Sequence, residues 1–324
     1  MNFIWQKVLP RLKILLDKRT EQSCSEFPIG RLDLTGSFAS DLIHTNIISG
    51  RPFLAARIGT TELEAITIYL LNQANRRHIG EKTFRYLFSN TPKFWWHQGI
   101  KDSLAKGAGM FSTDSQGLDT FASRFISDLS QIDILGSWNA DELLLQDHLV
   151  KCKRIPLKDL EPYYNSPPWS RALQGMKVLV IHPFSLSIKS QYSRKEKLYC
   201  DTSVLPEFEL ITFKPVQTIA NNRDNRFGSW SDALDHMCLE ISTLNFDIAI
   251  IGAGSYGLPL GSFIKQMGRQ AVHLGGATQI MFGVKGRRWE SKPFFQALFN
   301  DSWVRPRHDE TPSNSETVEG GCYW

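Results

Sequence analysis

The sequence has no run of apolar residues long enough to cross a membrane. A spanning helix needs about 20 consecutive, mostly apolar residues, and no stretch of the 324-residue chain approaches this. The N-terminus also lacks the uninterrupted apolar core and the small-residue cleavage site of a signal peptide. We therefore expect a cytoplasmic protein.

Cysteines are few, odd in number and widely spaced. The five are Cys24, Cys152, Cys200, Cys238 and Cys322. No C-x-x-C pair is present, so the spacing does not suggest a zinc site, a redox dithiol or a disulfide framework. They are expected to be reduced thiols, which fits a cytoplasmic location.

The chain also lacks a strong excess of charge of one sign. Its formal net charge is only +4, which is small for this length and does not indicate a nucleic-acid surface. A hydrophobic content of 42% with 22% charged residues is enough to bury a full core, so general disorder is excluded.

The first 18 residues place apolar side chains at helical spacing, with lysines and arginines between them. This pattern predicts an amphipathic basic helix. Such a helix either packs on the domain or a partner, or lies on an anionic membrane surface. In the second case, residues 1–19 would make a peripheral contact at the inner face of the membrane.

We expect three segments along the chain. Residues 1–40 hold the helix and a polar connector, 41–300 form the catalytic domain, and 301–324 form a flexible tail. Three prolines between Pro162 and Pro168 mark a possible internal seam near 160–170. The chain ends in two aromatic residues, which either fold back on the domain or extend freely.

Short apolar runs alternate with helical patterns through the domain. Strands are predicted at 52–59, 132–136, 177–183, 208–213, 246–251 and 270–274, and helices at 63–71, 230–244 and 258–267. This alternation predicts an α/β fold, a Rossmann-like, doubly wound and mostly parallel sheet.

An early strand ends in a tight turn that opens a helix. Arg57 and Gly59 follow the apolar run, and Thr60 or Thr61 can cap the helix in whose first turn Glu62 lies. This geometry gathers anions and metals at the carboxyl edge of a parallel sheet. Glu62 has two open interpretations, a ligand-binding acid or one that complements the helix dipole.

A G-x-G-x-x-G turn follows the strand 246–251 and precedes a helix. Gly252, Gly254 and Gly257, with Tyr256 among them, form a candidate phosphate-binding turn. The acid that would hold an NAD ribose about 20 residues later is missing, because that strand ends in His273, Leu274 and Gly275. We therefore expect a nucleotide or phosphate ligand and no NAD.

Further candidates follow other strand ends. The loop after the last strand is a further candidate phosphate site, formed by Gly275, Gly276, Lys285, Arg287 and Arg288. Its cations would neutralise the phosphate, and the alternative is a solvated basic patch. His182 and His273 each end a strand, where an acid or base would act, and a structural role is equally open for each.

Two of these segments carry a resemblance to a known family. The run Arg57-Ile-Gly-Thr-Thr-Glu62 and the stretch 267–275 resemble the GT-D fold glycosyltransferases of bacterial cell-surface polysaccharide and glycoprotein pathways. There the turn reads R-x-G-D-G-E, and its D-x-E carboxylates are associated with metal and nucleotide-sugar binding. Here Thr60 and Thr61 replace the aspartate and glycine. A manganese or magnesium ion on Glu62 then needs the donor diphosphate or another acid to complete its shell.

The resemblance implies an enzyme that moves a sugar from a nucleotide-sugar donor to a glycan or lipid-linked glycan acceptor. Glu62, His182 and His273 are the candidate catalytic residues, and the arginines and glycine turns would bind the donor. Two alternatives stay open. One is another transferase or hydrolase acting on a nucleotide or sugar phosphate, and the other is a non-catalytic nucleotide-binding subunit of a polysaccharide assembly complex.

Overall fold

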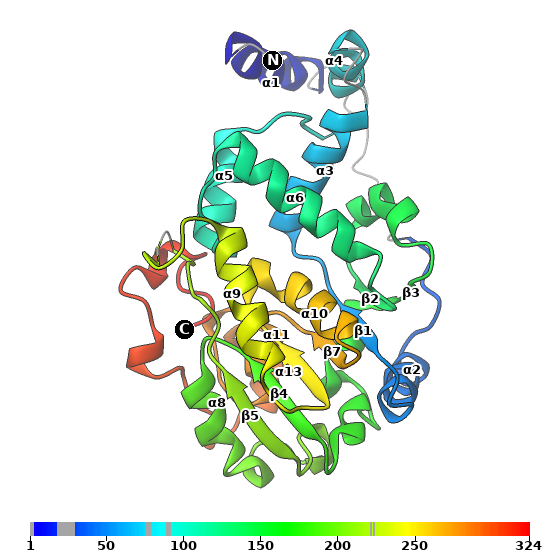
Figure 1. Cartoon of the computed structure of the whole chain (residues 1–324), viewed down its shortest axis with the longest axis vertical. Coiled ribbons are helices and arrows are strands. Elements are labelled where there is room, and N and C mark those ends of the chain that lie inside the picture. Colours follow the sequence, from blue (N-terminus) through cyan, green and yellow to red (C-terminus); the bar gives the residue numbers. More distant parts are fainter. Residues whose placement is uncertain (1–2, 18–29, 75–78, 89–91, 221, 223) are drawn as a thin grey trace.

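The computed structural model describes residues 3–17, 30–74, 79–88, 92–220, 222 and 224–324 (Figure 1). Its centre is one seven-stranded sheet with the order β3-β2-β1-β7-β6-β4-β5, and all neighbouring strands are parallel. The strands are β1 Phe53–Ala56, β2 Ile134–Ser137, β3 Lys153–Pro156, β4 Lys177–Ile181, β5 Glu209–Phe213, β6 Ile248–Ile251 and β7 Gln270–His273.

Helices connect the strands and cover both faces of the sheet (Figure 1). The α-helices are α1 Phe3–Asp17, α2 Ser37–Ile48, α3 Thr60–Ala74, α4 Ile79–Phe88, α5 Gln98–Ser103, α6 Ser115–Leu129, α7 Leu157–Leu160, α8 Ser185–Tyr192, α9 Trp230–Ser242, α10 Gly257–Gln266, α11 Ala277–Met281, α12 Arg287–Glu290 and α13 Pro293–Leu298.

The side chains of each strand alternate between two separate cores. In β1, Leu54 and Ala56 contribute to a core with residues of α3, α6, α9 and α10, whereas Phe53 and Ala55 contribute to one with residues of α2, α8, α11 and α13. Because a parallel sheet buried on both faces needs apolar residues at successive positions, its strands read as continuous apolar runs. The α/β, doubly wound, Rossmann-like prediction is therefore confirmed.

The sequence predicts six of the seven strands and misses β3 at the edge of the sheet. In β3 only Ile155 is fully buried, and the charged Lys153 and Arg154 hide the apolar signal. Helices α2 and α6 are also absent from the sequence-based prediction. The sheet contains strands from both sides of residues 160–170.

The predicted N-terminal helix is present as α1, which packs against α4. Leu9 is buried in a small cluster with Tyr86, Phe94 and Trp95. Residues 20–29 of the expected connector lie outside the described residues. In the part of the chain that the structure describes, no helix is long and apolar enough to cross a membrane.

The C-terminal segment is not the flexible tail that its polar composition suggests. Val318 and Trp324 are buried in the second core, and the carboxylate of the buried Glu310 accepts hydrogen bonds from the amides of Leu186 and Ser187 at the start of α8. The polar residues bind the helix end while the aromatic terminus packs on the domain. Of the two alternatives for the terminus, the structure shows the folded one.

Candidate functional site

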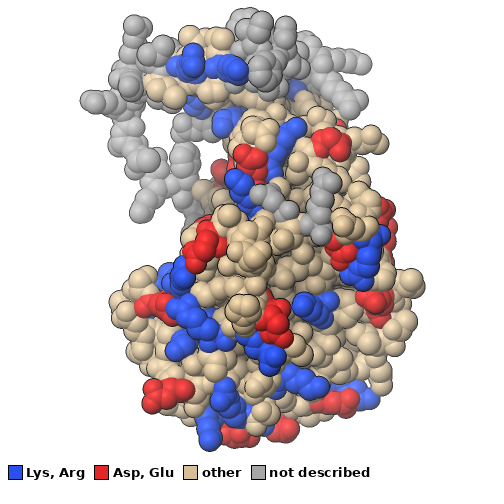
Figure 2. Space-filling model, turned by 90° about the vertical axis from the view of Figure 1, so that its left-hand side faces the viewer, with Lys and Arg blue, Asp and Glu red and all other residues tan. Residues whose placement is uncertain are grey.

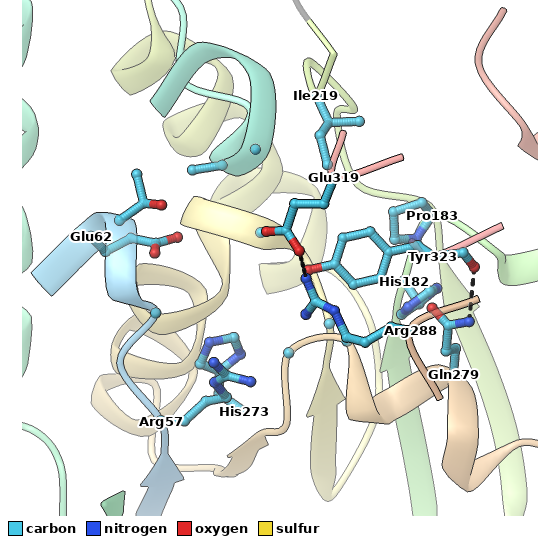
Figure 3. A pocket seen from close by; sticks show the side chains of 18 of the residues that line it. Arg57, Glu62, His182, Pro183, Ile219, His273, Gln279, Arg288, Glu319 and Tyr323 are labelled. Carbon is cyan, nitrogen blue, oxygen red and sulfur yellow. Dashed lines mark hydrogen bonds and ion pairs between the residues drawn. The ribbon is translucent and has the colours of Figure 1, made fainter. Parts of the chain in front are cut away.

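A cavity of about 440 Å³ lies at the carboxyl ends of β1, β4, β6 and β7 (Figure 3). Its walls come from the loops that follow these strands, from Trp138 after β2, from residues 107–108, from Gln217 and Ile219 after β5, and from the C-terminal segment. Ligands of open α/β sheets bind at this edge, and the volume is within the usual range of about 300–1,000 Å³ for small-molecule sites.

Most of the candidate site residues line this one cavity. They are Arg57, Gly59, Glu62, His182, Gly252, Gly254, His273, Gly275, Gly276 and Arg288.

Four other candidates lie outside the lining. Tyr256 is buried behind the wall, where its ring stacks on Trp230 with centroids 5.3 Å apart. Gly257 packs against the ring of His273. Lys285 donates its amide to Val304, and Arg287 pairs with Glu316 at 2.8 Å on the surface. The basic loop after β7 therefore brings only Arg288 to the cavity.

The turn after β1 folds back on itself around Gly59. A Cβ on Gly59 would overlap the carboxylate of Glu62, so a larger residue here would displace this side chain. Helix α3 then begins with the Leu63 amide donating to the Gly59 carbonyl at 2.9 Å. Burial raises the pKa of Glu62, although its own backbone amide and the charge of Arg57 act in the opposite direction.

Arg57 lines the cavity without an ion pair to any residue that the structure describes, although its charge acts to lower the pKa of Glu62 and of Glu161. Its guanidinium lies over the ring of Trp138 at 5.1 Å, and the indole of Trp138 is fixed by a 3.1 Å hydrogen bond to the Ile58 carbonyl. It forms no ion pair or hydrogen bond with any residue that the structure describes. A half-buried arginine that forms no ion pair is a binding point for an anion.

Arg288 differs from Arg57 because the C-terminal segment already binds it. Glu319 forms an ion pair with its guanidinium, and the ring of Tyr323 lies under it at 4.6 Å (Figure 3). The Arg288 amide also donates to the Cys322 carbonyl at 3.0 Å. Two arginines thus face one cavity, one paired and one unpaired.

His182 is held as a neutral hydrogen-bond donor. Its Nδ1 accepts the amide of Phe184 at 2.9 Å, so the ring proton is on Nε2, which has no partner among the described residues. Burial lowers the pKa of His182 to about 3. In this tautomer the Nε2 proton of His182 can be donated to a ligand oxygen, and the ring does not take a proton from one.

His273 has the opposite tautomer. Its Nδ1 lies 3.2 Å from the Ile251 carbonyl, which can only accept, so Nδ1 carries the proton and Nε2 has the free lone pair. Burial and the charge of Arg57 lower the pKa of His273 to about 4. The two histidines therefore offer the cavity one donor and one acceptor, both without charge near neutral pH.

The glycine turn after β6 is present, but packing explains two of its glycines. A Cβ on Gly252 would lie 2.6 Å from the His182 ring, and one on Gly257 would overlap His273. The amides of Gly252, Tyr256 and Gly257 donate to the carbonyls of Ile181, Ala253 and Gly254. Phosphate binding at this turn therefore depends on the remaining amides, at residues 253–255.

Several lining residues were not among the sequence candidates. They include Trp138, Gln279, Glu319, Tyr323 and Trp324. Trp138 directly follows β2, so its position at a strand end was a usable signal. Nothing local indicates that residues 319–324 return to the sheet edge, because their contacts are with distant parts of the chain.

The donor set does not fit a resident divalent cation on its own. In the ranges that the structure describes, no three histidine, cysteine, aspartate or glutamate side chains gather as a metal site. Glu62 is accompanied in the lining by Thr60 and Thr61, and the other lining carboxylate, Glu319, pairs with Arg288. Magnesium and calcium prefer six or more oxygen ligands, so a metal ion here would need further ligands from a bound donor.

Comparisons with known proteins add little to this geometry. No protein-family model matches the sequence, and no curated protein matches it. A solved structure described as the selenomethionine-substituted domain of unknown function 1792 covers 96% of this chain and 99% of its own. Its sequence identity is 11% and its TM-score is 0.44. The fold and the cavity themselves define the class: a Rossmann-like α/β protein with a ligand-sized site at its carboxyl edge.

Proposed function

We propose that this protein is a glycosyltransferase that uses a nucleotide-sugar donor and a glycan or lipid-linked glycan acceptor. The observation that carries the proposal is the unpaired guanidinium of Arg57, which lines a cavity at the carboxyl edge of the sheet together with Glu62. A nucleotide sugar combines an anionic diphosphate, which Arg57 would bind, with sugar hydroxyl groups, which Glu62 would bind.

The arginines bind the diphosphate in this proposal. Arg57 supplies positive charge without losing an existing ion pair, whereas Arg288 contributes when Glu319 releases it. As the bond between C1 of the sugar and the diphosphate oxygen breaks, negative charge grows on the leaving group. Fixed cations in a partly buried site stabilise that charge more than they stabilise the bound donor.

Glu62 is the proposed proton acceptor. The acceptor oxygen bonds to C1 while its proton passes to the Glu62 carboxylate. The raised pKa of Glu62 brings this carboxylate closer to the operating pH, which favours general base catalysis. His182 donates from Nε2 to a ligand oxygen, and His273 accepts a ligand hydroxyl at Nε2. Both are positioning contacts, because the low pKa of each ring makes it a weak base.

A ligand and turnover screen tests the proposal. We expect uridine, cytidine or guanosine diphosphate to raise the melting temperature, in proportion to affinity, and NAD and NADP to leave it unchanged. The matching nucleotide sugar should be hydrolysed slowly, and the screen is run with and without manganese. Nucleotide binding without hydrolysis or transfer would support the non-catalytic subunit, and absence of binding by every nucleoside diphosphate would contradict the proposal.

A further inference from the structure

Helices α1 and α4 form a pair at one end of the molecule, away from the sheet and the cavity (Figure 1). Leu9 of α1 is buried against Tyr86 of α4 and against Phe94 and Trp95 of the following loop. The three aromatic rings pack edge to face, with centroids 5.0 to 6.4 Å apart. This small core holds the pair together and determines which side chains point outward.

Large apolar side chains lie on the outside of this pair. On α4, Phe84 and Phe88 are one helical turn apart and are 63% and 61% exposed, with ring centroids 4.8 Å from each other. On α1, Val8, Leu12 and Ile14 are also exposed. Isolated exposed apolar residues are common, but a group of five on two contacting helices indicates an interaction surface.

The charges on α1 have one sign. Between residues 7 and 14, where the side chains of α1 are described, the charged residues are Lys7, Arg11 and Lys13. Lys7 and Arg11 are exposed, and Lys13 lies over the ring of Tyr86 at 4.7 Å. Figure 2 shows lysine and arginine side chains at this end of the molecule. On α4, Glu81 is exposed and adds one acid. Exposed apolar side chains beside the cations of α1 complement an anionic lipid surface.

We propose that the α1–α4 surface, formed by Val8, Leu12, Ile14, Phe84 and Phe88 with Lys7 and Arg11, docks on an anionic lipid surface. The helices lie in the interface, with the apolar side chains among the acyl chains and the cations at the headgroups. This surface is separate from the cavity, so the inference does not depend on the proposed function.

Vesicle flotation of the full chain tests the inference. Wild-type protein should float with phosphatidylcholine vesicles that contain phosphatidylglycerol, and much less with phosphatidylcholine alone or at high salt. The double variant Phe84→Gln, Phe88→Gln should bind about tenfold more weakly or worse, which corresponds to a loss of roughly 1.4 kcal/mol. Because both rings are exposed, its melting temperature should match the wild type.

Phe38→Gln is the matched control. Phe38 is 71% exposed on α2, outside the α1–α4 surface, so its loss should leave flotation unchanged. Equal flotation of the double variant and the wild type would overturn the inference. A wild-type protein that does not bind anionic vesicles would also overturn it. If that protein were a dimer and the Phe84→Gln, Phe88→Gln variant a monomer, the surface would bind a second copy instead of lipid.

Discussion

Glu319 pairs with Arg288 inside the cavity, although the two residues are 31 positions apart in the chain. Glu319 has a φ of 47°, and Gly320 and Gly321 follow with φ of 66° and 75°. A left-handed conformation is unfavourable for a residue with a Cβ. The bend therefore uses two glycines and one strained residue to bring a carboxylate to a cation that an anionic ligand would bind.

Glu319→Gln should strengthen anion binding. Without the carboxylate, Arg288 is free to bind phosphate, and we expect inorganic pyrophosphate and nucleoside diphosphates to bind about tenfold more tightly, or roughly 1.4 kcal/mol. Stability should change by less than about 1 kcal/mol, because the Glu319 side chain is 68% exposed. Titration calorimetry measures the affinity.

The control for this change is Glu316→Gln. Glu316 pairs with Arg287 in the same segment but outside the cavity, so its loss should leave affinity unchanged. Equal affinities for the wild type and Glu319→Gln would show that Arg288 does not contact the ligand.

Arg57→Gln should weaken anion binding with only a small loss of stability. The wild-type guanidinium has no ion pair to lose, but it lies over the Trp138 ring and its charge favours the carboxylates of Glu62 and Glu161, so the melting temperature should fall only slightly. Pyrophosphate affinity should fall by about tenfold to a hundredfold, as expected for a charge-assisted contact of roughly 1.5–3 kcal/mol. Arg287→Gln removes a cation outside the cavity and serves as the comparison, and similar affinities for both variants would refute this role of Arg57.

The two buried histidines should make stability fall as the pH is lowered below about 6.5. The pKa is about 3 for His182 and about 4 for His273 in the folded protein, against 6.5 when unfolded. Below pH 6.5 the unfolded chain binds more protons, so each histidine costs about 1.4 kcal/mol of unfolding free energy per pH unit. Above pH 6.5 this effect is absent.

A variant comparison isolates this effect from the buried acids, whose raised pKa values act in the opposite direction. Urea unfolding of the wild type and of His182→Gln at pH 7 and pH 5.5 gives the pH dependence of each. The stability of the variant should decrease less between the two values, by about 1 kcal/mol. Parallel curves would mean that His182 is not neutral and buried in solution.

The strand ends that form the cavity could be predicted from the sequence, because each is a local signal. A buried apolar run followed by a glycine or a polar residue located Arg57, His182, Gly252 and His273 correctly at the carboxyl edge. Parallel topology then brings such residues together without any knowledge of side-chain contacts.

The chemical state of the same residues could not be predicted. The tautomer of His182 depends on the Phe184 amide, and that of His273 on the Ile251 carbonyl. The return of Glu319 to Arg288 depends on packing of the C-terminal segment against distant elements. For a related reason the sequence could not show which cation of the basic loop lines the cavity. Arg287 and Arg288 are adjacent in sequence, but their side chains pair with Glu316 and Glu319.

Gly257→Ala tests whether the glycine turn is required by packing against His273. Gly257 has an ordinary helical φ of −60°, so alanine brings no backbone strain, and its helix propensity alone would favour folding by up to about 1 kcal/mol. The new Cβ would, however, overlap the His273 ring. Overpacking a filled core costs about 1–3 kcal/mol, so we expect net destabilisation.

Two further variants decide the cause of that loss. Gly80→Ala in α4 meets nothing within 4 Å of its Cβ and should be neutral or slightly stabilising. Removing the ring with His273→Ala should make the Gly257→Ala change nearly neutral, because the clash no longer exists. Denaturant unfolding of the four proteins of this double-mutant cycle gives the coupling between the two sites. Additive losses would show that the cost of Gly257→Ala does not come from the His273 ring, and would refute the packing explanation for this glycine.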